Sequence, residues 1–262
     1  MALIPQGYLD SVVSIGVRTD TNIAWIGTGF FIGKSTGTAG QVYPFLVSNK
    51  HVFANRRYVV IRMRQKGVEN LNEINVPLTN DGGLPLYYVH EKESVDIAVL
   101  PLEAKFIKDN NLEFPCFNIE ENSMSSDELR QNGVDEGSII YMLGFPMGLV
   151  NVTSNLPICR MGCVARMSEN QIIENHNILV DIQNFPGNSG SPIVTKPERV
   201  SIVETKSLSR CVLVGIVHSY IPYQEKLINS QTNQVVEIRS ENSGIALVHP
   251  VEYIREILNK FL

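Results

Sequence analysis

The sequence lacks the marks of a membrane, secreted or nucleic-acid-binding protein. No apolar run reaches the roughly 18 residues of a membrane-spanning helix, and Met1 to Asp10 contain no basic leader of the kind that directs secretion. The net charge of −5 and the pI near 5.6 offer no basic surface for nucleic acid. These absences predict a cytoplasmic protein that binds neither a membrane nor a nucleic acid.

Cysteine is also scarce, with four residues in 262. Cys159 and Cys163 lie close together in a predicted strand, at a spacing that suits neither a zinc knuckle nor a tight disulfide. Cys116 and Cys211 are far from them in the sequence. Because reduced thiols are the rule in the cytoplasm, we expect free cysteines and no disulfide or metal site.

The segment FPGNSGSP, residues 185–192, places Ser189 between glycines on a predicted tight turn. Gly187 would let the backbone turn so that its own N–H and that of Ser189 converge on one point, and Gly190 would keep the far side clear. Two converging donors are what an oxyanion hole requires. A turn of Gly, Asn and Ser that merely joins two strands has the same composition, so the segment alone leaves both interpretations open.

A serine hydroxyl needs a base, and a carboxylate that orients this base, to act as a nucleophile at neutral pH. His51 follows the apolar run 43–47 and a polar step, and Asp96 precedes the apolar run 97–100. The order His51, Asp96, Ser189 puts the three residues on separate strands and loops, so only a folded core could bring them together. We therefore predict that they form a catalytic triad.

The chain resembles the trypsin-like, chymotrypsin-fold serine peptidases, and in style it is most similar to the bacterial HtrA-like and glutamyl-endopeptidase-like branches. The order and spacing of five blocks are the basis of this resemblance. They are GTGFFI at 27–32, SNKHV at 48–52, DIAVL at 96–100, GFPMG at 144–148 and PGNSGSP at 186–192. The resemblance implies an all-β fold of two six-stranded antiparallel β-barrels with a C-terminal α-helix.

The resemblance also implies a serine endopeptidase that needs no cofactor. His51 would take the proton of Ser189, Asp96 would orient the imidazole, and the N–H groups of Gly187 and Ser189 would hold the oxyanion while an acyl-enzyme forms. The substrate would be a protein or peptide bound as an extended strand along Ser219 and Tyr220.

Short β-rich runs separated by Gly, Asn and Asp predict two sets of strands. The first set is residues 12–17, 25–32, 42–48, 58–63, 86–90 and 97–100, and the second is residues 138–143, 150–165, 171–183, 191–195, 211–220 and 244–248. We expect an N-terminal barrel at 1–102, an interbarrel connection at 103–135 with a serine-capped short helix, a C-terminal barrel at 136–250, and an amphipathic helix at 251–262.

Specificity is predicted from departures from the family pattern. In trypsin-type relatives an aspartate six residues before the serine selects Lys or Arg, and this position is Gln183 here. A neutral amide has no charge for a basic side chain, so tryptic specificity should be absent. His218 and Ser219, opposite residues 243–244, could instead donate to an acidic or amide side chain. If His218 points away, a shallow pocket for small or apolar side chains is the competing interpretation.

Asn188 precedes the serine where digestive relatives have an aspartate that pairs with a new N-terminus after zymogen cleavage. An amide cannot form this ion pair, so we expect a chain that is competent without cleavage or gated by the ordering of its oxyanion loop. Two other functions stay open: a catalytically silent binding module with the same fold, and a dedicated processing or defence effector protease that cleaves a single partner. The oligomeric state does not follow from the sequence.

Overall fold

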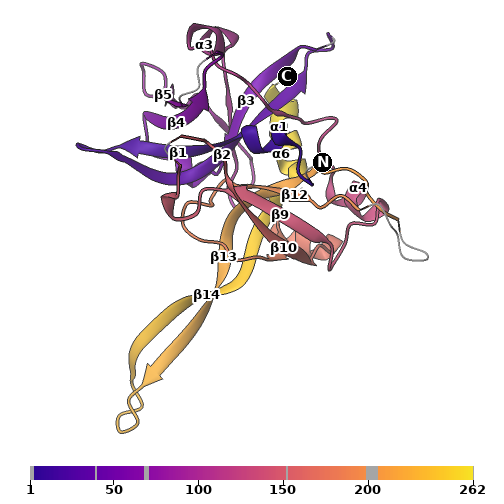
Figure 1. Ribbon diagram of the computed structural model, residues 1–262. Helices are drawn as coiled ribbons and strands as arrows, with labels where there is room; N and C mark the ends of the chain where they lie inside the picture. The colour runs from indigo at the N-terminus through magenta and orange to yellow at the C-terminus, as the bar shows by residue number, and fades with distance from the viewer. Residues whose placement is uncertain (1–2, 39, 68–70, 152, 199–205, 262) are drawn as a thin grey trace.

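The computed structural model describes residues 3–38, 40–67, 71–151, 153–198 and 206–261. Two β-sheets follow one another along the chain, with short helices at their margins and a longer helix at the C-terminal end (Figure 1). The fold is mostly β, as the succession of short β-rich runs and turns predicts. None of the helices in these residues is long and apolar enough to cross a membrane.

The first sheet is built from the N-terminal half of the chain. Its strands are β1 (Val12–Arg18), β2 (Ile23–Ser35), β3 (Val42–Ser48), β4 (Tyr58–Arg64), β5 (Leu71–Pro77), β6 (Tyr88–Val89), β7 (Ala98–Pro101) and β8 (Phe117–Asn118). They lie in the order β5-β4-β1-β2-β3-β7-β6, and β8 pairs with β2 in parallel. Because Ser48 at the end of β3 pairs with Ala98 at the start of β7, the segments that contain His51 and Asp96 leave the sheet side by side.

The second sheet is a closed six-stranded barrel with the order β10-β11-β14-β13-β12-β9. Its strands are β9 (Ile139–Gly144), β10 (Ile158–Arg166), β11 (Ile178–Asp181), β12 (Pro192–Thr195), β13 (Leu213–Ile228) and β14 (Val235–Pro250). Side chains such as Met142, Val180 and Ile193 fill its interior. Since β12 begins at Pro192, the barrel wall fixes one end of the loop that contains Ser189.

The predicted closed C-terminal barrel is confirmed, whereas the first sheet does not close among the described residues. There β5 pairs with β4 and β6 pairs with β7, and no hydrogen-bonded ladder joins the β5 edge to the β6 edge. The run 86–90 forms a strand of two residues, too short to bridge the two edges. The sequence also failed to predict β5.

The helices are α1 (Gln6–Asp10), α2 (Lys50–Phe53), α3 (Ala104–Asp109), α4 (Ser126–Gln131), α5 (Glu169–Asn175) and α6 (Val251–Phe261), with a 3-10 turn η1 (Pro146–Gly148). Two predicted helices are confirmed. One is α4, where Ser125 forms a capping box with Glu128, and the other is the terminal helix α6. The strand predicted at 171–183 is wrong in its first half. Ser168 caps α5 there, and His176 ends the helix in a left-handed conformation.

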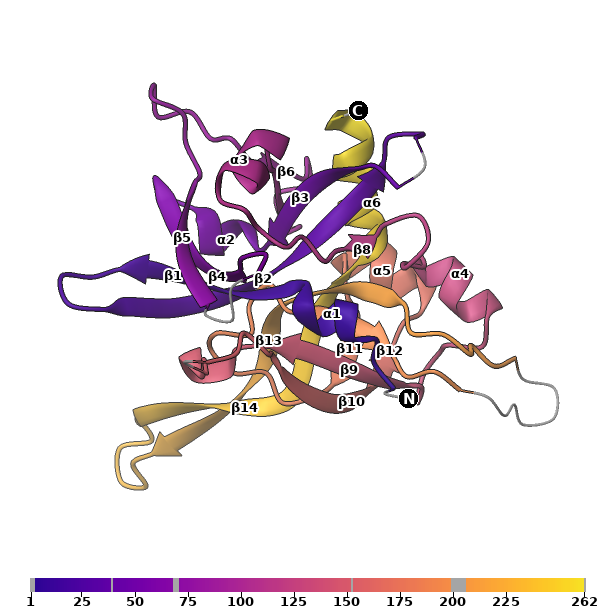
Figure 2. The ribbon, with the colours of Figure 1, turned by 45° about the horizontal axis from the view of Figure 1, so that its top comes forward.

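One apolar cluster joins the two sheets. Phe30 and Phe117 of the first sheet, Leu143 and Phe145 of the barrel, and Ile254 of α6 are all buried in it. The two sheets therefore share this cluster in addition to the apolar cluster that each has of its own, and α6 packs on both sheets (Figure 2). The loop that contains Ser189 is consequently held by both halves of the chain.

Candidate active site

His51 lies on α2, a single helical turn that follows β3. Val52 and Phe53 are buried beneath this turn, while the side chain of His51 is 51% exposed. Its Nδ1 lies 2.5 Å from Oδ2 of Asp96, and its backbone N–H donates to Oδ1 of the same carboxylate at 3.0 Å. The Nδ1 contact orients the ring, so Nε2 faces away from Asp96, and the backbone contact holds the carboxylate in place.

Asp96 is held from several sides and is 21% exposed at its side chain. Its carbonyl oxygen accepts a hydrogen bond from Nδ2 of Asn49 at 2.8 Å. Burial raises the pKa of the carboxyl group, but hydrogen bonds and charge from His51 outweigh this effect and lower the pKa below its ordinary value. The carboxylate is therefore ionised at neutral pH, and the proton of the short contact belongs to Nδ1 of His51.

Two further imidazoles lie beneath Asp96. Nε2 of His249 accepts a hydrogen bond from the Asp96 backbone N–H at 3.0 Å, and Nδ1 of His249 lies 2.6 Å from the carbonyl oxygen of His176. Nδ1 must donate in the second contact, so His249 is neutral with its proton on Nδ1. The ring of His218 stacks on His249 with 3.8 Å between the ring centroids. Burial lowers the pKa of His218 to about 3 and that of His249 to about 4.

Thr28 connects the Ser189 loop to the first sheet. Its N–H donates to the carbonyl oxygen of Ser189 at 2.8 Å, and its hydroxyl donates to the carbonyl oxygen of Gly187 at 2.7 Å. The same hydroxyl accepts a hydrogen bond from the Phe145 N–H, and the Thr28 carbonyl accepts one from the hydroxyl of Ser48. Ser48 ends the strand that leads to His51, so a short series of hydrogen bonds relates Ser189 to His51. The sequence contained the motif GTGF but did not predict this role.

The peptide between Pro186 and Gly187 has a defined orientation. The Pro186 carbonyl accepts a hydrogen bond from the N–H of Met147 at 2.5 Å. The peptide is trans, so the Gly187 N–H points the opposite way. Within the described residues, neither this N–H nor that of Ser189 has an acceptor. Gly187 has φ of +96°, and a Cβ there would lie 2.4 Å from the carbonyl oxygen of Phe145, so this conformation requires glycine.

Ser189 is half-buried, and its hydroxyl makes no hydrogen bond to His51 in the part of the chain that the structure describes. Hydrogen bonds between nucleophile and base are often long in unliganded enzymes and tighten when substrate binds. Asn188, in contrast, is fully buried, and its side-chain atoms have no hydrogen-bond partner among the described residues.

The residues predicted to line the specificity pocket fall into two groups. Gln183 is exposed, and its Nε2 lies 3.5 Å from the position of a Cβ on Gly244. The carbonyl oxygen of Ser219 accepts a hydrogen bond from Nδ2 of Asn184 at 3.0 Å, which holds the strand that continues to Tyr220. His218 is turned to His249 instead. The expectation that His218 donates to a substrate side chain stays a prediction, and its placement favours the competing interpretation.

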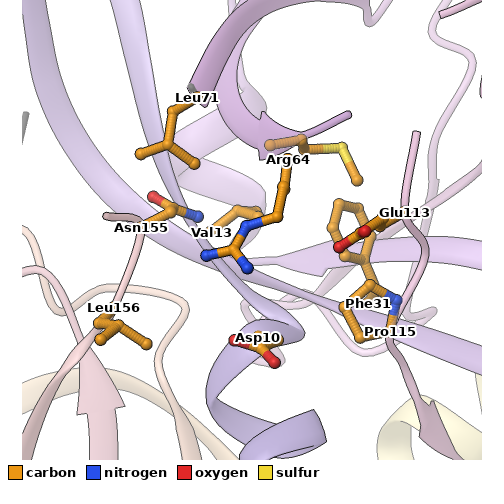
Figure 3. A pocket seen from close by; sticks show the side chains of 10 residues that line it. Asp10, Val13, Phe31, Arg64, Leu71, Glu113, Pro115, Asn155 and Leu156 are labelled. Atoms are coloured by element: carbon orange, nitrogen blue, oxygen red, sulfur yellow. The ribbon is translucent and has the colours of Figure 1, made fainter. Parts of the chain in front are cut away.

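The remaining candidate sites do not extend this arrangement. The described residues contain no group of three side chains that could hold a metal ion, and the four cysteines are unpaired. A small pocket of about 40 Å³ is lined by Arg64 and by the carboxylates of Asp10 and Glu113, among others (Figure 3). None of the residues His51, Asp96 or Ser189 lines it.

The β-barrel, the His51–Asp96 pair and the serine loop together define a peptidase-like fold and site. The profile of the trypsin-like peptidase domain matches residues 27–200, and the chain belongs to this family. The crystal structure of the MamO protease domain from Magnetospirillum magneticum in its apo form has the same fold, with a TM-score of 0.50, 13% identity, and coverage of 95% of this chain and 96% of that chain. No curated protein matches significantly. The HtrA-like and glutamyl-endopeptidase-like branches stay a prediction.

The buried imidazoles of His218 and His249 predict a loss of stability in weak acid. In the unfolded chain both imidazoles would gain protons as the pH falls through about 6.5. In the folded chain His249 stays neutral until about pH 4 and His218 until about pH 3. The unfolded state therefore binds more protons in this window, and the free energy of unfolding should fall by on the order of a few kcal/mol as the pH drops from about 6.5 to about 4. Urea denaturation at a series of pH values measures this change.

The matched control is the double variant His218→Gln and His249→Gln. Without the two imidazoles, its free energy of unfolding should depend less on pH over the same window, whatever its absolute stability. Parallel pH curves for the variant and the unsubstituted chain would show that other groups cause the acid loss.

Proposed function

We propose that the protein is a serine endopeptidase in which Ser189 is the nucleophile, His51 the general base and Asp96 the carboxylate that orients it. The observation that supports this most directly is the orientation of the Pro186–Gly187 peptide. Among the residues that the structure describes, it leaves the N–H of Gly187 without an acceptor, in the same loop as the N–H of Ser189, which also has none there. Two such donors would stabilise an oxyanion.

The proposed mechanism uses the proton positions given above. Because Nδ1 of His51 keeps its proton against Asp96, Nε2 has a lone pair that accepts the proton of the Ser189 hydroxyl. The serine oxygen attacks the peptide carbonyl, and the N–H groups of Gly187 and Ser189 hold the resulting oxyanion. His51 then gives its proton to the leaving amine, and an acyl-enzyme remains. Water, deprotonated by His51, releases the acid and restores Ser189.

The primary pocket is proposed to be neutral. Gln183 supplies an amide where a carboxylate would be needed for a Lys or Arg side chain, and His218 is stacked on His249 beneath Asp96. The arrangement supports a pocket for small or apolar side chains more than one for acidic side chains. The protein substrate would bind as an extended strand along Ser219 and Tyr220. The cytoplasmic location expected from the sequence stays a proposal.

One observation favours the silent binding module instead: the described residues show no hydrogen bond between Ser189 and His51. In that case the fold would bind a polypeptide at the same edge without cleaving it. The two functions differ in the reactivity of Ser189, which a small electrophile can test without any knowledge of the substrate.

The test is labelling of the full-length chain with a fluorophosphonate probe. The chain should react without prior proteolytic cleavage, because the peptide of Gly187 already has its orientation and Asn188 needs no N-terminal partner. The Ser189→Ala variant should not react. The extent of labelling is read by intact-protein mass spectrometry.

Ser191→Ala is the matched control for this experiment. Ser191 lies in the same loop, is fully buried, and its hydroxyl has no partner among the described residues, so its loss should leave labelling unchanged. Labelling that persists in Ser189→Ala would refute the assignment. A full-length chain that stays unlabelled until its N-terminus is trimmed would refute competence without cleavage.

A further inference from the structure

Strands β13 and β14 continue far beyond the barrel as a two-stranded arm, residues 222–242. Both views show this arm projecting away from the rest of the molecule (Figures 1 and 2). Its ladder runs from the pair Pro222 and Asn242 to the pair Ile228 and Val235. Every residue from 222 to 241 is exposed. The sequence predicted strands only to Tyr220 and from Gly244, so the arm was not expected.

The arm exposes several large apolar side chains, and only its base is tied to the barrel loops, where Nδ2 of Asn242 donates to the carbonyl oxygen of Asn184. Tyr223, Leu227, Ile228, Val235, Val236 and Ile238 are 45% to 69% exposed. A two-stranded hairpin has little stability by itself in water, and exposed apolar side chains gathered in one place are typical of interaction sites. The connecting turn, residues 229–234, is entirely polar. A polar tip does not suit insertion of the arm into a membrane.

The outer edge of β13 connects the arm to the proposed active site. β12 pairs with β13 only up to Ile216. At the next residue, Val217, the N–H donates to the carbonyl oxygen of Ser191 and the carbonyl accepts from the N–H of Gly190, both in the Ser189 loop. Beyond Val217, no strand among the described residues pairs with this edge. The free edge thus begins beside Ser189 and runs outward to Ile228.

Proline 222 fits this assignment. Proline has no backbone N–H to give to a ladder, and within sheets it is largely confined to edge strands. Pro222 lies opposite Asn242, and the register of the ladder shifts between Tyr220 and Pro222. An edge of about eleven residues, 218–228, extends over roughly 35 Å at the usual rise of a strand.

We propose that the arm binds the part of the substrate that precedes the scissile bond, as an extended, apolar polypeptide strand added along β13. This inference rests on the proposed function. β13 runs outward from the Ser189 loop, so an added antiparallel strand runs inward and brings its C-terminal end to Ser189. Antiparallel pairing is the commoner kind, and β13 pairs antiparallel with both of its neighbours. The N-terminal side of the substrate therefore lies on the arm.

This arrangement defines a substrate class. The preferred substrate is an unfolded or locally unfolded protein with about ten extended residues before the cleaved bond, several of them apolar. Tyr223 and Leu227 would contact side chains on one face of the added strand, and Ile228 and Ile238 those on the other, because side chains alternate across a sheet. A folded domain presents no such strand.

The experiment compares the full chain with an arm-shortened variant in which Asn-Gly replaces residues 223–241, a turn suited to joining Pro222 to Asn242. A peptide that the full chain cleaves is extended by seven alternating Val and Ser residues, either before or after the cleaved bond. The full chain should gain at least about tenfold in kcat/KM from the extension before the bond and nothing from the extension after it. The shortened variant should lose this gain and keep wild-type activity on the unextended peptide.

A point variant covers the case in which the shortened chain does not fold. Ile238→Glu should reduce the gain from the extension several-fold. Ile173→Glu is its control, because Ile173 is similarly exposed but lies on α5, away from the arm. An equal gain in the full chain and in both arm variants overturns the proposal. The proposal is also overturned if sedimentation shows that the full chain is a dimer and the shortened variant a monomer, while the gain from the extension persists. The arm would then bind a second copy of the chain and not the substrate.

Failure of this proposal and failure of the peptidase assignment are distinguishable. Fluorophosphonate labelling reports the activity of Ser189 in every variant and does not involve the arm. Binding of a permanently unfolded polypeptide, reduced and carboxymethylated lactalbumin, to the Ser189→Ala chain reports the arm without catalysis. Shortening the arm should weaken this binding at least about tenfold, and unchanged binding contradicts the proposal.

Discussion

Replacement of Ser189 by alanine should lower the hydrolysis of a cleaved peptide by roughly 10³- to 10⁶-fold and leave the free energy of unfolding unchanged. The rate falls because no other hydroxyl in the loop is accessible: Ser191 is fully buried. Stability is kept because the Ser189 hydroxyl has no hydrogen-bond partner in the described chain whose pairing would be lost. The measurements are kcat/KM and urea denaturation.

His51→Ala and Asp96→Asn should cause losses of similar size. The asparagine variant is informative because its amide keeps the shape of the carboxylate but cannot accept hydrogen bonds at both positions that face His51. The imidazole would then adopt the tautomer with its proton on Nε2 and could not act as a base. Ser191→Ala is again the control and should keep full activity. Appreciable turnover by Ser189→Ala would show that another group is the nucleophile.

Gly187→Ala should lower kcat by about 10²- to 10³-fold, the usual effect of losing one oxyanion donor. A side chain at this position is strained at φ of +96° and would meet the Phe145 carbonyl oxygen at 2.4 Å. The Pro186–Gly187 peptide would have to rotate, and its N–H would leave the position beside the N–H of Ser189. The change should appear in kcat more than in KM, because the donor acts on charge that develops in the transition state.

Gly37→Ala is the matched control for this substitution. Gly37 also has a positive φ, +84°, but a Cβ there meets nothing within 4 Å. This variant pays the same kind of backbone strain at a surface turn and should keep wild-type activity. If both alanine variants lost activity alike, the effect would be one of global stability, and the role given to the Gly187 peptide would be wrong.

Local sequence patterns predicted the strand that leads to His51 and the loop that contains Ser189. β3 was predicted with its observed bounds because an apolar run ends at a polar step, and the same step places His51 on its short helix. The serine loop was predicted from its glycines, whose positive φ angles the structure shows. The pairing of His51 with Asp96 was predicted because a serine nucleophile needs a base and a carboxylate that orients it, and the contact of 2.5 Å agrees with this prediction.

Contacts between distant segments were beyond the reach of the sequence. His249 supports Asp96 from 153 positions away, and Thr28 holds Gly187 from 159 positions away. No local periodicity encodes such partners. The helix α5 was mistaken for a strand because Ile172 and Ile173 are β-branched neighbours, although the Ser168 cap signals a helix. The arm was missed because its apolar residues face both sides and follow no single period.

The four hydrogen bonds of Thr28 would make the reactivity proposed for Ser189 dependent on the folding of both halves of the chain. The loop of Ser189 obtains its shape from a residue in the first sheet, while His249, near the end of β14, supports Asp96 in that first sheet. Neither half of the chain can therefore place Ser189, His51 and Asp96 in their positions by itself. During synthesis, Ser189 in its proposed role would stay unreactive until the chain as far as His249 had left the ribosome and the two halves had docked. Partly folded copies would also be unreactive. In a cell, the number of active molecules would therefore equal the number of fully folded molecules.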